Sequence, residues 1–111
     1  MRQDVSGWQT RLDDAIIAEH VARGVWRNLT LADLADALVE EVPDRVLVIE
    51  GQQRFTARDL HAQAAALASA LQARGLAAGD VISFQLPNWN EALVIDLAAA
   101  MLGLVCNPII P

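Results

Sequence analysis

The sequence predicts an α/β fold with an incomplete sheet, and three observations lead to this class. The last third of the chain alternates between short β-rich runs and a long apolar helical run, which is the pattern of a strand–helix–strand crossover. The middle third places helical segments with one apolar face on either side of another β-rich run. Ahead of four helical segments, a threonine or asparagine stands three residues before an acid, as in a helix capping box.

The crossover near the carboxyl terminus is the most informative segment. Residues 81–86 have the composition of a buried strand, and residues 104–106 that of a second one. Between them, residues 90–102 form a largely apolar helix that Gly103 ends. Parallel sheets need cover on both faces and further strands on each side. We therefore interpret the chain as the opening piece of a larger α/β protein whose catalytic part lies outside it.

Further helices and a hairpin are predicted ahead of this crossover. The helices are expected over residues 12–22, 31–41 and 57–74, where apolar residues recur at helical spacing. Residues 46–49 form a short β-rich run. Residues 54–55 are expected to return beside that run as a short antiparallel strand.

The helix starts are expected to be capped by Thr10, Thr30, Thr56 and Asn88. Each side-chain oxygen can accept a hydrogen bond from a free backbone N–H group. The acid that follows lies in the first helical turn, where the helix dipole favours negative charge. Trp89, beside the last of these residues, is expected to pack its helix onto the sheet.

Composition excludes several classes of partner. The 111 residues include 14 acids and 8 basic residues, all arginine, for a net charge of −6. No arginines form a stripe, so nucleic-acid binding is not expected. The apolar run 92–106 is interrupted by Asp96 and is shorter than the ~20 residues of a membrane span. No secretory leader is expected in residues 1–8, and the single Cys106 fits a cytoplasmic location.

None of the polar residues forms a pattern typical of catalysis. The six glycines are not spaced as a phosphate-binding loop, and the chain has no lysine. His20 and His61 have no metal ligands at suitable spacing, and partly exposed helix positions are expected for both. We expect Asp96 to make a structural hydrogen bond and Cys106 to be a small core residue. The predicted set of catalytic, cofactor-binding and metal-binding residues is therefore empty.

Three ordered segments cover nearly the whole chain: residues 24–31, residues 43–51 with 55–60, and residues 79–89 with 98–108. The last is the most specific, with Gly79-Asp80-Val81 leading into Leu86-Pro87-Asn88. In this order the segments resemble the amino-terminal end of the adenylate-forming (AMP-binding) superfamily, specifically the acyl-CoA synthetases and acid–CoA ligases. Arg58 replaces a glutamate that is common in the family, and we interpret it as a surface change.

The resemblance implies an ATP-dependent carboxylic acid–CoA ligase. In such enzymes a fatty, alicyclic or aryl acid attacks the α-phosphate of ATP, and the coenzyme A thiol then displaces AMP from the acyl-adenylate. Mg²⁺ would screen the phosphates. The family's phosphate loop, its acidic ribose contact and its mobile lysine are all expected beyond residue 111, so none is transferred to this chain. The 111-residue chain is accordingly expected to bind no cofactor and to be inactive alone.

The domain organisation follows from the same comparison of segments. Residues 1–111 are predicted to be a partial amino-terminal subdomain, with residues 1–28 as a leading helix and connector and residues 29–111 as the α/β portion. The alternative is a stand-alone, non-catalytic interaction module of the same ancestry. Residues 104–110 are apolar and have no strand to pair with, which predicts a homo-oligomer formed through this edge.

Two short segments are expected near a ligand cleft. Residues 86–88 and 106–108 follow the predicted strands, and open α/β sheets bind ligands outside the carboxyl ends of their strands. We do not assign either segment as ligand-binding.

Overall fold

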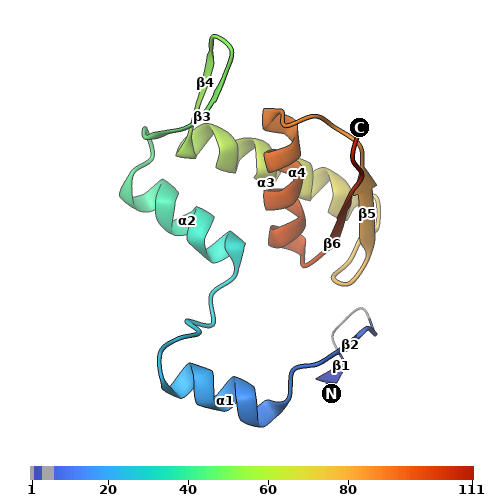
Figure 1. Ribbon diagram of the computed structural model, residues 1–111. Coiled ribbons are helices and arrows are strands. Elements are labelled where there is room, and N and C mark those ends of the chain that lie inside the picture. The colour runs from blue at the N-terminus through green and yellow to red at the C-terminus, as the bar shows by residue number, and fades with distance from the viewer. Residues whose placement is uncertain (1, 4–6) are drawn as a thin grey trace.

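Two crossing helices, α3 (Ala57–Ala73) and α4 (Asn90–Leu102), form the centre of the structure (Figure 1). The structure is a computed structural model that describes residues 2–3 and 7–111. At the crossing, Ala64, Ala68 and Ala98 are buried, and larger apolar side chains pack around them. Because alanine is small, the two backbones approach closely, and the core consists of a helix contact rather than of large interlocking side chains.

The predicted crossover is confirmed. Strands β5 (Val81–Phe84) and β6 (Val105–Pro108) pair in parallel through α4, with Val81 opposite Val105 and Phe84 opposite Pro108. The predicted limits of both strands were wrong by up to two residues. Strand β6 starts after Leu104 because the Leu104 N–H group bonds to the Ala99 carbonyl at the end of α4. Strand β5 ends where its partner ends.

The hairpin predicted in the middle of the chain is confirmed as well. Strand β3 (Val46–Glu50) pairs antiparallel with β4 (Gln53–Thr56), with an irregularity between Val46 and Val48. The hairpin projects above α3 in Figure 1, and α2 (Leu31–Glu41) lies beside the two central helices. The described residues thus form three separate two-stranded sheets, in line with the incomplete sheet that was predicted.

The amino-terminal elements lie apart from this centre (Figure 1). They are α1 (Asp14–Ala22) and two short strands, β1 (Arg2–Gln3) and β2 (Gln9–Thr10), which pair antiparallel and were not predicted. Residues 1 and 4–6 are outside the described residues, so the interpretation of residues 1–8 is only partly covered by the structure. The division of the chain after residue 28 stays a prediction.

Two of the predicted helix caps are confirmed. The Thr30 hydroxyl accepts a hydrogen bond from the Asp33 N–H group at 3.2 Å, and the Asp33 carboxylate accepts one from the Thr30 N–H group at 2.7 Å. Thr56 and Asp59 repeat the arrangement at the start of α3, at 3.2 and 2.9 Å. These hydrogen bonds lower the pKa of both carboxyl groups, with the backbone hydrogen bond as the largest cause.

The other two predicted caps were wrong. Thr10 lies in β2, so α1 starts later and is capped by Asp13, whose carboxylate accepts a hydrogen bond from the Ile16 N–H group at 2.9 Å. At the start of α4, Trp89 rather than Asn88 occupies the capping position, and its side chain makes no capping hydrogen bond. A side chain from another element instead accepts a hydrogen bond from the first backbone N–H group of α4.

A large apolar surface remains exposed. The accessible surface is 7855 Å², whereas a compact monomer of this length exposes roughly 6,000 Å². The radius of gyration is 15.9 Å, against about 13 Å for a compact domain. The exposed apolar side chains include Leu31 and Leu34 of α2, Ile49 of β3 and Ile110 near the carboxyl terminus.

Candidate functional site

The carboxyl ends of β5 and β6 lie side by side, and the segments that follow them line an open hollow. Residues 86–88 form one wall and residues 108–111 the other. Residues 86–88 and 106–108 were expected near a ligand cleft. The structure places residues 86–88 and Pro108 around one hollow, whereas residues 106 and 107 do not line it. Because ligands of open α/β sheets bind at this end of the strands, the hollow is the candidate functional site.

Hydrogen bonds connect residues 83–85 to residues 107–110 beside the hollow. The Ile109 N–H group donates to the Phe84 carbonyl at 2.8 Å, which extends the strand pairing by one step. The Gln85 side-chain amide donates to the Ile110 carbonyl at 3.0 Å, and the Asn107 amide donates to the Ser83 hydroxyl at 3.0 Å. Backbone and side-chain contacts therefore fix residues 107–110 relative to residues 83–85, which lead into the wall formed by residues 86–88.

The chemistry of the lining residues is limited. The residues around the hollow are Leu86, Pro87, Asn88, Pro108, Ile109, Ile110 and Pro111. None carries a charge, so they cannot neutralise a phosphate or transfer a proton. The hollow can serve as an apolar wall beside a ligand, with Asn88 as its polar side chain.

A polar cluster that the sequence did not reveal lies at the start of α4, two residues after the wall formed by residues 86–88. The Glu50 carboxylate, at the end of β3, accepts a hydrogen bond of 2.6 Å from the Asn90 N–H group. The Asn90 side-chain amide donates to the Gln63 carbonyl oxygen on α3 at 3.0 Å. Asn90 is only 4% exposed, which makes it the buried polar residue of the described core. No local signal could have identified the cluster, because its members are 27 and 40 residues apart.

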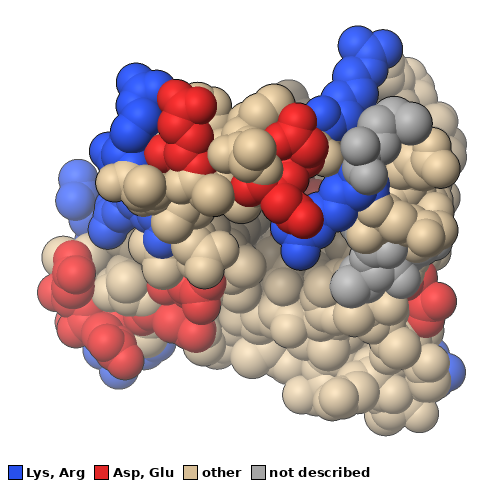
Figure 2. Space-filling model, turned by 90° about the horizontal axis from the view of Figure 1, so that it is seen from below, with Lys and Arg blue, Asp and Glu red and all other residues tan. Residues whose placement is uncertain are grey.

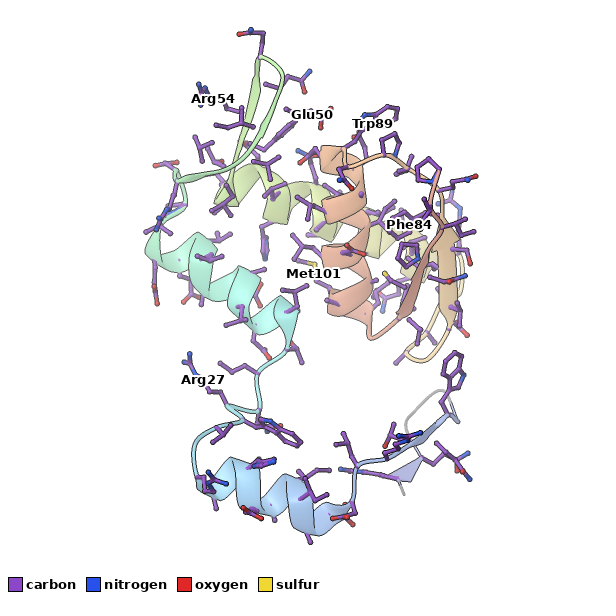
Figure 3. All side chains as sticks on the ribbon, viewed as in Figure 1. Arg27, Glu50, Arg54, Phe84, Trp89 and Met101 are labelled. Atoms are coloured by element: carbon purple, nitrogen blue, oxygen red, sulfur yellow. The ribbon has the colours of Figure 1, made fainter. Side chains whose placement is uncertain are left out.

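Trp89, which was expected to pack α4 onto the sheet, is 49% exposed, while the neighbouring Asn90 is buried. The packing of α4 onto the sheet through Trp89 stays a prediction. Trp89 lies at the turn that enters α4, beside the hairpin residue Glu50 (Figure 3). The turn directs Asn90 toward α3, where Gln63 accepts a hydrogen bond from its side-chain amide and Glu50 accepts one from its backbone N–H group. The Asn90 Oδ1 atom is buried and has no hydrogen-bond partner among the described residues.

The two histidines contact side chains of the fold itself. The His61 Nε2 atom on α3 lies 2.6 Å from the Asp36 carboxylate on α2, and this contact joins the two helices. His61 also borders an apolar cavity of about 130 Å³ between α2, β3, α3 and α4. The His20 ring lies against Trp26, with 4.7 Å between ring centroids. Both rings are half-buried, as expected, and the described residues contain no group of three metal-binding side chains.

Cys106 and Asp96 lie together between β6 and α4. Burial raises the pKa of the Cys106 thiol to about 11, and the nearby Asp96 carboxylate adds to the effect. The thiol is therefore protonated near neutral pH, which disfavours a nucleophilic role. Cys106 is half-buried rather than fully in the core. The structural hydrogen bond expected for Asp96 stays a prediction.

Charged side chains of both signs are mixed over part of the surface, and uncharged residues cover the rest of the face seen in Figure 2. Several of the arginines form exposed ion pairs with neighbouring acids. Arg58 lies 3.0 Å from Asp44, and Arg23 lies 3.1 Å from Glu19. Arg58 is indeed a surface residue, so its departure from the family pattern does not disturb the core. Among the described residues, no helix is both long and apolar enough to cross a membrane.

Comparisons with known proteins identify the family. Residues 35–111 match the family described as "AMP-binding enzyme". This chain belongs to the AMP-binding enzyme family. A medium-chain fatty-acid–CoA ligase of Escherichia coli is 35% identical over 95 residues, which cover 85% of this chain and 17% of the relative. A salicylyl-CoA synthase/salicylate adenylyltransferase of Streptomyces is 36% identical over 73% of this chain and 15% of its own length.

Solved structures of the same family share the fold. A putative long-chain-fatty-acid CoA ligase of Rhodopseudomonas palustris superimposes with a TM-score of 0.70 and 32% identity, over 73% of this chain and 21% of that structure. The amino-terminal subdomain of NpsA from Klebsiella oxytoca superimposes with a TM-score of 0.69 and the same identity and coverage. The chain thus spans about a sixth of the length of these two curated relatives and about a fifth of these two solved structures.

Proposed function

We propose that this AMP-binding family member is the amino-terminal part of an ATP-dependent carboxylic acid–CoA ligase that acts through an acyl-adenylate. The observation that carries the proposal is the 35% identity to the medium-chain fatty-acid–CoA ligase over 85% of this chain. In the proposed reaction a carboxylate oxygen attacks the α-phosphate of ATP and pyrophosphate leaves. The coenzyme A thiol then attacks the acyl carbonyl, and AMP leaves with formation of the thioester.

The substrate is proposed to be a fatty, alicyclic or aryl carboxylic acid. The two curated relatives named above support a fatty or aryl acid, because one is a medium-chain fatty-acid–CoA ligase and the other a salicylyl-CoA synthase/salicylate adenylyltransferase. ATP, Mg²⁺ and coenzyme A are the proposed co-substrates and cofactor of the whole enzyme. Because these are metabolites of the cytoplasm and Cys106 is a free thiol, we propose a cytoplasmic location.

The 111-residue chain by itself is proposed to be inactive and to bind none of these cofactors. It has no lysine and no glycine-rich phosphate loop, and neutral side chains line the hollow at the strand ends. Its proposed role is to brace the ligand cleft with covering helices and sheet strands. The alternative, a stand-alone interaction module, has no observation in its favour.

The exposed apolar surface has a proposed role in assembly. The accessible surface exceeds that of a compact monomer by about 1,900 Å², which is comparable with one side of an obligate interface. In the whole enzyme, other parts of the ligase would cover this surface. The expectation that residues 104–110 have no strand to pair with was wrong, because residues 105–108 pair with β5 and the Ile109 N–H group bonds to the Phe84 carbonyl. When the 111 residues are produced alone, we propose that they form homo-oligomers through the exposed apolar surface, which includes the edge at residues 104–110. Light scattering that gives the monomer mass at high concentration would contradict this proposal.

The functional proposal is tested by ATP–pyrophosphate exchange with a panel of carboxylic acids. The full-length product of the gene should exchange labelled pyrophosphate into ATP with at least one fatty or aryl acid. The 111-residue chain should show no exchange with any of them. Exchange by the short chain would refute its proposed inactivity, and the absence of exchange by the full-length product with every acid would refute the ligase assignment.

A further inference from the structure

We infer that Glu50 is a positioning residue, which holds the loop before α4 in place as one wall of the hollow at the strand ends. This inference deepens the proposed ligase function and rests on it for the identity of the bound ligand. It assigns a role to a side chain on the β3–β4 hairpin, an element that does not itself line the hollow.

The first step of the argument is the unusual start of α4. Helices usually satisfy their free amino-terminal N–H groups with the side chain of the capping residue. The capping residue of α4 is Trp89, which has no such hydrogen bond. The Glu50 carboxylate supplies the acceptor instead, through the 2.6 Å contact with the Asn90 N–H group. This negative charge also lies at the positive end of the dipole of a 13-residue helix.

The second step is the anchoring of the cluster. Glu50 is half-buried, and Asn90 is almost completely buried. The Asn90 side chain is bound in turn to Gln63 of α3, so the start of α4 is attached to two elements that are distant in sequence. A charge-assisted hydrogen bond in such a position is stronger than a solvent-exposed one, because water competes less for its partners.

The third step links the cluster to the hollow. Only Trp89 separates Asn90 from residues 86–88, which form one wall of the hollow. The Trp89 N–H group donates to the Pro87 carbonyl at 2.7 Å, so this short turn is tight and moves as a unit. Figure 3 shows Glu50 and Trp89 close together where the hairpin meets the start of α4. Loss of the Glu50 contact should therefore release the turn and the wall together.

The inference predicts a local change in hydrogen exchange. In the full-length protein, Glu50→Ala should speed amide exchange in residues 88–92 by about tenfold or more, because a hydrogen bond to a charged group is lost. Glu50→Gln keeps the shape and one acceptor oxygen, so it should show a smaller increase. Glu40→Gln, which neutralises an exposed acid on α2, is the control and should leave this segment unchanged.

Steady-state kinetics supply a second readout. A displaced wall weakens ground-state and transition-state binding alike, so Glu50→Ala and Glu50→Gln should raise KM for the ligand that contacts the wall, with kcat preserved. We expect at least a roughly threefold rise in KM for either the acid or ATP, and none for the Glu40→Gln control. A variant that only loses folded enzyme would instead lower kcat with KM unchanged.

The results separate this inference from the proposed function. Unchanged exchange in residues 88–92 of Glu50→Ala, or a uniform increase throughout α3 and α4, would overturn the local positioning role. A fall in kcat at constant KM would overturn the link to the hollow. If the wild-type protein activates no acid, the ligase proposal fails, whereas the hydrogen-exchange comparison still decides whether Glu50 holds the loop.

Discussion

Substitution of Gly103 by alanine should destabilise the contact between the end of α4 and the loop before β5. Gly103 has a φ of 70°, which glycine adopts freely and other residues rarely adopt. A Cβ atom at this position would lie 3.2 Å from the Cβ of Ala78. The Gly103 carbonyl also accepts a hydrogen bond of 2.9 Å from the Gly79 N–H group, so the loop cannot move away without a cost.

The magnitude follows from three contributions. The left-handed conformation costs an alanine about 1–2 kcal/mol, and the close contact with Ala78 adds about 1 kcal/mol of overpacking. The lower entropy of the unfolded chain returns about 0.4–1 kcal/mol. We therefore expect the free energy of unfolding to fall by about 2 kcal/mol, which at a typical dependence on urea shifts the midpoint by about 1 M.

Controls separate backbone strain from steric contact. Gly75 at the end of α3 has a φ of 90°, and a Cβ atom there would meet nothing within 4 Å, so Gly75→Ala should cost only about 0.5–1 kcal/mol. In a double-mutant cycle, Ala78→Gly should recover about 1 kcal/mol of the Gly103→Ala loss. The assay is urea unfolding followed by circular dichroism at one low protein concentration. Equal losses for the two glycine variants, or no coupling with Ala78, would refute the argument from close contact.

Further predictions concern the titratable groups and one core side chain. Alkylation of Cys106 by iodoacetamide at pH 8 should be about 100-fold slower than that of an ordinary thiol of pKa 9.0, because a pKa of about 11 leaves about 0.1% thiolate. Equal alkylation rates in native and urea-unfolded protein would contradict the raised pKa of Cys106. Since hydrogen bonds lower the pKa of Asp33 and Asp59 from 3.8, the stability that they add is present above pH 3.8 and is lost as the pH falls through the lower folded values. An Asp33→Asn/Asp59→Asn variant should thus lose less stability below pH 3.8 than the wild type in acid titrations followed by circular dichroism, and equal losses would contradict this reasoning. Leu60 is 5% exposed, so Leu60→Ala should lower the free energy of unfolding by about 2–5 kcal/mol in urea unfolding followed by circular dichroism. A decrease of less than about 1 kcal/mol would show that Leu60 does not lie in a close-packed core.

Local patterns predicted much of the fold. The α2 and α4 limits agree with the structure to the residue, and the capping boxes at Thr30 and Thr56 are where their spacing placed them. These features depend on residues within one helical turn of each other, so the sequence window contains all of their partners. The predictions for Thr10 and Asn88 failed because the same spacing also occurs where another residue is better placed to cap the helix.

The candidate site was only partly predictable. Residues 86–88 and 106–108 could be placed at one edge of the sheet, because parallel strands joined by a helix end on the same side. The second wall of the hollow consists of residues 108–111, so only Pro108 of the predicted segment 106–108 lines it. The position of this wall depends on contacts such as that of Gln85 with Ile110, which are 25 residues apart. The contact of His61 with Asp36 spans the same separation, and no periodicity or motif indicated it.

The amino-acid sequence by itself determined the α/β class, the order of the elements and the membership in the AMP-binding family, since these depend on apolar periodicity and on short ordered motifs. Only the tertiary structure decided that Asn90 is buried while Trp89 is exposed. It also decided that Glu50 rather than Asn88 accepts the hydrogen bond from the first N–H group of α4. The physical reason is that a buried N–H group requires an acceptor but does not specify where in the chain that acceptor lies. Packing of the hairpin, α3 and α4 brings Glu50 to this position from 40 residues away.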